Sequence, residues 1–258
     1  MDPLSSTKRQ NNTPHSSSPH SEMFDAAYTG NLNRFKRLAL NHAKGEEIGV
    51  REEIRKAKDR DGRGSLHIAA AGGSLQVCRY LLETLKLDVD PKDGRGITPL
   101  YHAIFEGHLD TVRYLLENGA YADASSDANY TPLRCAAESG DIKIITLLLS
   151  RGARVDVASR SGTALQEAAF NGHRDAVKVL LDHGANPNVA IGLYTYIPLF
   201  SAISAKSWEC VELLLQAGAD PNAVSYGYTP LAIPAKYGHV DVIRRLLKAG
   251  ADPNYKMN

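Results

Sequence analysis

The apolar and small residues of this chain follow one order that recurs every 32 to 34 residues. Each copy contains a Leu that serves as its anchor. Ala follows three positions after this Leu in all but the last copy, and Gly follows seven positions after it in all but the fifth. Gly-Ala follows nineteen residues after five of the six leucines. Self-similarity at a fixed period indicates a repeat architecture. The anchor residues are Leu66, Leu100, Leu133, Leu165, Leu199 and Leu231.

Each copy predicts two short helices joined by a turn. A Thr before the anchor is placed to cap the first helix, and a Pro at the first helical position needs no N–H partner. The Gly after the anchor permits the positive φ that ends this helix, and the apolar run that follows predicts a second helix. An Asp- and Asn-rich turn then leads to the next copy. The predicted capping residues are Thr98, Thr131, Thr163 and Thr229.

The words around the anchors, such as TPLYHAI and TPLRCAA, resemble the T-P-L-H-x-A signature of ankyrin repeats. The resemblance implies an all-α ankyrin-repeat solenoid of stacked helix-turn-helix units with β-turn fingers. One pair of such short helices buries its apolar face only against neighbouring pairs, so the core runs along the array. The chain is also similar to plant ankyrin proteins that in longer forms carry tetratricopeptide repeats, although it contains no such repeat itself.

The repeat pattern divides the chain into three parts. Residues 1–21 are rich in Ser, Pro and Asn and predict a disordered tail, because they hold too little apolar area to offset the entropy of ordering. Residues 22–59 predict a degenerate ankyrin-like cap with a charged insertion. Residues 60–258 predict six repeats, with the boundaries 60–93, 94–126, 127–158, 159–192, 193–224 and 225–258.

Three copies depart from the consensus. The first has Gly64-Ser65 in place of Thr-Pro and Leu85 in place of the terminal Gly, which predicts weak helix ends. The fifth has Lys206 at the turn, where a non-Gly residue at positive φ costs about 1 kcal/mol. The sixth has Pro234 inside its first helix, which predicts a lost hydrogen bond or a kink.

Composition narrows the classes of function. The 258 residues carry a net charge of +1, which gives no excess positive field for nucleic acid. No apolar run is long enough to span a membrane, and no apolar segment of a signal peptide is present. The three cysteines form no disulfide framework, which suits a reducing compartment. We therefore expect neither nucleic acid nor membrane as a partner, and a location in the cytoplasm or nucleus.

Searches for catalytic and metal-binding motifs return nothing, which predicts that the chain is not an enzyme and has no catalytic residue, metal site or cofactor. Cys78 and Cys210 fall among apolar neighbours, which favours core packing over redox or metal chemistry. His108 and His173 recur after the turn Gly, as does His239 in the last copy. Their recurrence favours a structural role over one as ligand or general base.

The ankyrin resemblance implies a concave binding surface made by the turn tips and the exposed ends of the first helices. We call it the aromatic stripe: the positions three, five and six before each anchor and five and six after it. These thirty positions hold eight of the chain's 18 aromatic residues. Tyr and Phe are common at binding hot spots, and charged neighbours add orientation. The predicted partner-binding residues are Arg95, Phe105, Glu106, Tyr130, Glu138, Arg160, Phe170, Tyr194, Tyr196, Tyr226, Tyr228, Lys236 and Tyr237.

Shielding of the core is the alternative role for these side chains. Tyr194 and Tyr196 would then cover a longer loop, and Phe105 would pack on the next helix. For the whole chain we predict a non-catalytic scaffold or adaptor that binds another protein. The alternative is the ankyrin portion of a longer protein or enzyme, including phosphatase-regulatory and ubiquitin-ligase adaptor roles. We expect a monomer unless the apolar C-terminal end self-associates.

Overall fold

The computed structural model describes residues 19–126, 130–159, 162–190 and 197–255. Those residues are helical, and their only β-structure is two isolated bridges. None of the helices among them is long and apolar enough to cross a membrane. The helices are α1 (Ser21–Tyr28), α2 (Leu32–His42), α3 (Glu47–Lys56), α4 (Ser65–Ala71), α5 (Leu75–Arg79), the π-helical turn η2 (Tyr80–Thr84), α6 (Pro99–Phe105), α7 (Leu109–Glu117), α8 (Pro132–Ser139), α9 (Ile142–Ser150), α10 (Ala164–Phe170), α11 (Arg174–Asp182), α12 (Pro198–Ser204), α13 (Trp208–Gln216), α14 (Ala232–Tyr237) and α15 (Val240–Lys248).

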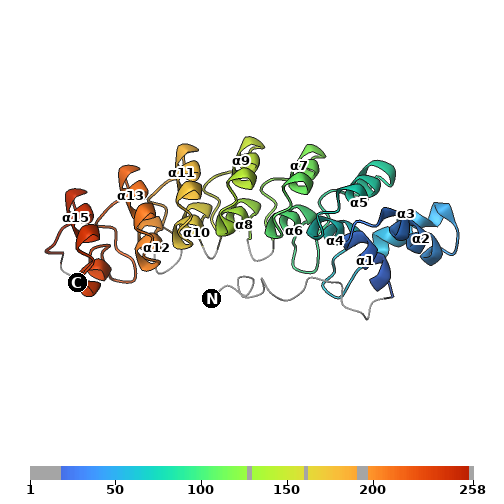
Figure 1. Cartoon of the computed structure of the whole chain (residues 1–258), viewed down its shortest axis with the longest axis horizontal. Coiled ribbons are helices and arrows are strands. Elements are labelled where there is room, and N and C mark those ends of the chain that lie inside the picture. The colour runs from blue at the N-terminus through green and yellow to red at the C-terminus, as the bar shows by residue number, and fades with distance from the viewer. Residues whose placement is uncertain (1–18, 127–129, 160–161, 191–196, 256–258) are drawn as a thin grey trace. The chain divides into compact units, whose positions relative to one another are not determined.

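The chain divides into two compact units, Met1–Pro132 and Leu133–Asn258, and the same packing occurs within each. In the first unit α1, α4 and α6 pack successively, and α5 packs against both α2 and α7. In the second unit α10, α12 and α14 form one row and α9, α11, α13 and α15 form the other. First helices also pack on the second helix of their own repeat, as α6 does on α7, α10 on α11 and α12 on α13 (Figure 1). This is the predicted helix-turn-helix repeat.

The anchor leucines form the core of each repeat. Leu100 and Leu165 are fully buried, and the anchors of the other repeats up to the fifth are at most 3% exposed. Leu231, in the sixth repeat, is only half-buried. The N-terminal segment repeats the arrangement, because Met23 occupies the anchor position and is fully buried. Gly30, seven residues after Met23, has a positive φ of 74°, within the 65° to 78° of the turn glycines of the later repeats.

The turn Gly and the residue after it form a seam between successive repeats. Gly73 has φ of 65°, and a Cβ on it would lie 2.7 Å from the ring of His108 in the next repeat. His108 Nε2 in turn bonds to the carbonyl oxygen of Ala71 at 3.0 Å. The same seam recurs between Gly140 and His173, whose Nε2 bonds to a carbonyl of the preceding first helix at 3.0 Å. His108 and His173 are therefore structural, as their recurrence indicated, whereas the buried Nε2 of His239 has no hydrogen-bond partner.

Asparagine side chains link successive fingers in the second unit. Asn188 Oδ1 accepts from the backbone N–H of Asp220 at 2.8 Å, and its Nδ2 donates to the carbonyl of Gly218 at 2.9 Å. One repeat later, Asn222 makes the equivalent bonds to Asp252 and Gly250 at 2.7 and 2.9 Å. Each Asn satisfies one donor and one acceptor of the following turn, so the fingers are ordered by their neighbours.

The predicted helix starts are partly wrong. Thr163 Oγ1 accepts from the backbone N–H of Gln166, as a cap should, at 3.3 Å. Thr98 holds the capping position of α6, but its buried hydroxyl caps nothing and has no hydrogen-bond partner. Thr229 caps no helix, because α14 begins only at Ala232. Pro234 is the reason: it has no N–H to donate to the carbonyl four residues earlier, so the first helical turn does not form.

The first repeat ends its second helix in a way the sequence pattern did not show. A π-helical turn, η2, follows α5 and accommodates one extra residue. The left-handed position therefore falls on Lys86, with φ of 51°, instead of on Leu85. The backbone N–H of Leu87 then bonds to the carbonyl of Leu81 at 3.1 Å and closes the helix end.

Candidate functional site

An open pocket of about 610 Å³ lies between the fifth and sixth repeats, within the second unit. Its walls are α12, α14 and the finger that precedes α14. Four of its lining residues were predicted as partner-binding residues, namely Tyr226, Tyr228, Lys236 and Tyr237. Three of these are large aromatic side chains with exposed fractions of 44%, 50% and 60%. The structure thus brings the C-terminal part of the aromatic stripe into one concave site.

The finger presents its two tyrosines through a strained tight turn. Ser225 and Tyr228 exchange two backbone hydrogen bonds of 2.9 Å, and the two residues between them have positive φ, 53° at Tyr226 and 77° at Gly227. Positive φ at both central residues defines a type I′ turn, which normally has Asn or Asp at the first of them. A Tyr there costs on the order of 1 kcal/mol, and such strain clusters at binding sites.

Two lysines flank the aromatic surface. Lys206 Nζ lies 5.7 Å from the centroid of the Tyr237 ring, and Lys236 Nζ lies 5.5 Å from it. Both distances are within the range of a cation–π contact. Lys206 ends α12 at the turn position, and its φ of 58° confirms that this repeat has a non-Gly residue in the left-handed region. The site is therefore an aromatic surface with positive charge at its rim.

Six further residues line this pocket and were not predicted from the sequence, among them Phe200 and Lys206. Phe200 lies one residue after its anchor and Lys206 seven after, so both fall outside the offsets that define the aromatic stripe. The Phe200 ring lies 6.4 Å from that of Tyr226. The sequence contained a signal for Phe200: the residue directly after the anchor leucine varies from repeat to repeat between apolar and polar types.

The remaining predicted residues do not join this pocket. Phe170 is 57% exposed at the end of α10, and Glu138 lies half-buried at the end of α8. In the first unit, Phe105 and Glu106 are half-buried and Arg95 is exposed at a finger tip. The ring of Tyr130, half-buried, lies 6.4 Å from that of the buried Tyr101, which is the shielding contact expected of the alternative role. Arg160, Tyr194 and Tyr196 lie outside the described residues.

The buried thiols of Cys78 and Cys210 and the carboxylate of Asp93 have structural roles. Burial raises the pKa of the Cys78 thiol to about 12 and that of Cys210 to about 11, so neither is a nucleophile at neutral pH. Asp93 accepts from the backbone N–H groups of Arg95 and Ile97 at 2.8 and 2.9 Å and so organises its finger. The other carboxylate oxygen of Asp93 lies 3.0 Å from His102 Nε2, so this carboxylate is held by the finger and the first helix of its own repeat.

Comparisons with known proteins agree with the repeat architecture. The family model for ankyrin repeats, in three copies, matches residues 23–126, 122–191 and 193–257. Ankyrin repeat protein nuc-2 of Neurospora crassa is 34% identical over 189 residues, which cover 72% of this chain and 18% of the relative. The human transient receptor potential cation channel subfamily A member 1 is 26% identical over 69% of this chain and 17% of its own length. The chain thus spans about a fifth of the length of these relatives.

Among solved structures, the human ASB11 ankyrin repeat domain is similar with a TM-score of 0.73 and 28% identity, over 90% of this chain and 98% of that domain. The fold is therefore an all-α solenoid of helix-turn-helix repeats, and such repeats are generally protein–protein interaction modules. Since the family match extends from residue 23 to residue 257 and the helix pairs follow the same order, the chain belongs to the ankyrin-repeat family.

Proposed function

We propose that the chain is a non-catalytic adaptor that binds a partner protein through the pocket between α12 and α14. One observation carries the proposal: Tyr226, Tyr228 and Tyr237 are substantially exposed around a concave site. Other large side chains of the chain, such as Phe24 and Phe35, are fully buried. Large aromatic side chains that converge on a pocket are the residues that dominate binding energy in protein interfaces.

The chemistry of the pocket favours a particular kind of segment. Its floor includes Phe200 and Ile203, which suit an apolar or aromatic side chain of the partner. Lys206 and Lys236 stand at the rim, where a carboxylate of the partner would gain orientation and a faster association rate. The proposed ligand is therefore an extended protein segment in which an apolar side chain has an acidic neighbour.

The chain offers a matched control for the test. Tyr121 is 60% exposed, as Tyr237 is, but belongs to a finger base outside the aromatic stripe. Affinity purification with the full chain, followed by quantitative mass spectrometry, should show partners that Y237A and Y228A lose and that Y121A retains. With the purified partner, each loss should be at least about tenfold in Kd, as for a hot-spot residue.

Thermal unfolding separates binding from shielding. If Y237A lowers the unfolding temperature as much as a core substitution does and leaves partner recovery unchanged, the tyrosines shield the core and the proposal fails. Phe170→Ala tests whether the site extends along the array, because Phe170 is 57% exposed on the stripe but does not line the pocket.

A second role follows from the length of the relatives. The chain covers only 18% and 20% of two ankyrin repeat proteins that it matches, from Neurospora crassa and from Acanthamoeba polyphaga mimivirus. It would then be the interaction portion of a longer protein, including a phosphatase-regulatory or ubiquitin-ligase adaptor. Intact-mass measurement of the native protein decides this, since a mass above 28.0 kDa supports the longer chain and a mass of 28.0 kDa refutes it.

A further inference from the structure

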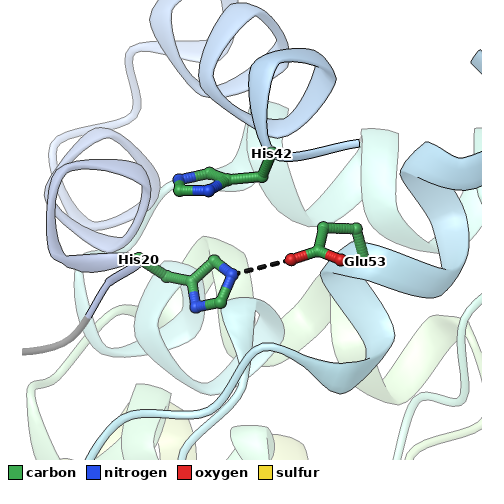
Figure 2. A group of neighbouring side chains, drawn as sticks. All are labelled: His20, His42 and Glu53. Carbon is green, nitrogen blue, oxygen red and sulfur yellow. Dashed lines mark hydrogen bonds and ion pairs between the residues drawn. The ribbon is translucent and has the colours of Figure 1, made fainter. Parts of the chain in front are cut away.

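Three side chains of the N-terminal segment, each from a different element, converge at one point within the first unit. His20 precedes α1, His42 is the last residue of α2, and Glu53 lies in α3. Each offers one ligand atom, and these atoms all lie within 4.8 Å of one another. Figure 2 shows the two imidazole rings facing each other with the carboxylate of Glu53 beside His20. Among the described residues this is the one such group of three.

The group is compact and partly shielded from solvent. His20 Nε2 lies 2.8 Å from Glu53 Oε1, and the ring centroids of His20 and His42 are 4.6 Å apart. The side chains of His20 and Glu53 are 19% and 32% exposed. Partial burial strengthens the attraction between a cation and the carboxylate, while the remaining exposure leaves a path for an ion and for a water ligand.

The set of donors is chemically selective. Two imidazole nitrogens and one carboxylate oxygen are a ligand set that zinc proteins use, with water in the fourth position. Calcium and magnesium prefer sites made of oxygen atoms alone. Tetrahedral zinc with bonds of about 2.1 Å needs ligand atoms about 3.4 Å apart. The three ligand atoms lie within 4.8 Å of one another, so shifts of about 1 Å would bring them to this spacing.

We propose that His20, His42 and Glu53 bind one Zn²⁺ ion that ties α1, α2 and α3 together. The three ligands come from three successive elements, so the ion closes the N-terminal segment into a single unit. The segment would gain from such a tie, because α3 is a strongly charged helix and, among its residues whose side chains the structure describes, only Val50 and Ile54 are buried. Sequence spacing gave no hint, since 22 and 11 residues separate the ligands and match no metal motif.

Zinc binding to the full chain tests the proposal directly. The protein is treated with a chelator, dialysed, and titrated with ZnCl₂ by calorimetry and with CoCl₂ by absorption spectroscopy. We expect one equivalent of Zn²⁺ to bind, and Co²⁺ to give the intense visible bands of tetrahedral coordination without a thiolate charge-transfer band. A thiolate band would instead assign the ion to the cysteines and overturn the proposal.

Substitutions then locate the ion. His42→Ala should weaken zinc binding at least about tenfold, because one of three ligands is lost. Glu53→Gln should do the same, although the amide oxygen can still accept from His20 and preserve the zinc-free fold. His183→Ala is the control, since His183 is exposed at the end of α11 and bonds to its own helix. Binding that survives both substitutions, or that His183→Ala removes, contradicts the assignment.

Hydrogen exchange distinguishes a zinc site from a simple hydrogen bond between His20 and Glu53, because only a zinc site makes the exchange rates depend on zinc. Zinc at 100 times its Kd should slow exchange about 100-fold at amides whose opening releases the ion, because it binds only the closed form. The slowing should fall on α1, α2 and α3 and leave α11 unchanged. The absence of any zinc-dependent slowing in these three helices would refute the tie, even if an ion binds elsewhere.

Discussion

The first repeat contains a buried histidine, His67, that should make this repeat less stable as the pH falls. Its replacement by glutamine should remove that pH dependence. His67 is fully buried. Its Nδ1 accepts from the backbone N–H of Gly64 at 3.2 Å, and its Nε2–H donates to the carbonyl of Ile97 at 3.1 Å. The bond at Nδ1 requires the neutral ring, because a protonated imidazole carries a hydrogen on both nitrogens and accepts at neither. Burial, followed by the charge of the neighbouring His102, lowers the pKa of His67 from 6.5 to about 3.

The sign of the pH dependence follows from this lowered pKa. Between pH 6.5 and pH 3 the unfolded chain binds a proton at His67 that the folded chain does not, so folding weakens as the pH falls through this range. At pH 6.5 the unfolded chain is already half protonated at His67, so the loss between pH 6.5 and pH 5.0 is about 1.6 kcal/mol. That energy corresponds to about a 15-fold increase in local opening.

The fourth repeat shows why glutamine is the right replacement. Gln166 occupies the equivalent position there, and its Oε1 accepts from the backbone N–H of Thr163 at 2.7 Å while its Nε2 donates to the carbonyl of Val189 at 3.4 Å. His67→Gln should therefore keep both hydrogen bonds and lose the titration. His67→Ala, as a comparison, should destabilise the repeat at every pH, because the bonded backbone groups lose their partner.

Hydrogen-exchange mass spectrometry of the full chain checks this at residues 65–71, with rates corrected for intrinsic exchange. The protection of α4 in the original protein should fall about 15-fold from pH 6.5 to pH 5.0, and that of His67→Gln should stay nearly constant. Asp93 does not confound this range. Burial raises its pKa, but hydrogen bonds from His102, Ile97 and Arg95 outweigh burial and hold it below the usual value of 3.8. Equal losses in the two proteins would refute the reasoning.

Four further substitutions test the packing of the second unit by urea unfolding. Glu167→Gln should destabilise by about 3 kcal/mol, because Arg134 is 5% exposed and would lose the carboxylate that lies 2.8 Å from it; a change within 0.5 kcal/mol would contradict a buried ion pair. Gly140→Ala should cost at least about 2 kcal/mol, since its Cβ would meet the ring of the next repeat at 2.6 Å, whereas Gly152→Ala, with equally positive φ and open space, should cost about 1 kcal/mol. Lys206→Gly should stabilise by up to about 1 kcal/mol through relief of strain and still weaken partner binding, which a purely structural lysine would not do.

The repeat architecture was predictable because each element of the pattern answers one physical demand. Leu100 and its counterparts supply the core, and Gly107 and its counterparts supply the positive φ that ends the first helix. The consequence of Pro234 was predicted only in kind. A missing N–H is evident from the residue itself, but the late start of α14 depends on whether the preceding turn finds other bonds.

The candidate site was less predictable, for a geometric reason. Offsets from the anchor selected Tyr226, Tyr228 and Tyr237, and these three side chains line the pocket. The same offsets excluded Phe200 and Lys206, whose participation depends on the tilt of two neighbouring first helices. The three proposed zinc ligands come from elements that do not share a common place in the repeat pattern, so no recurring spacing in the sequence indicates that they lie close together.

The seam between repeats has a consequence for how such a chain can change over generations. Because the glycine belongs to one repeat and the ring that fills its space belongs to the next, as with Gly140 and His173, neither position is free to vary alone. Duplicating or deleting a whole repeat, cut within the fingers, leaves every such pair matched. Short insertions within a helix pair break one. Gain and loss of entire repeats is therefore the least disruptive route by which this array lengthens or shortens.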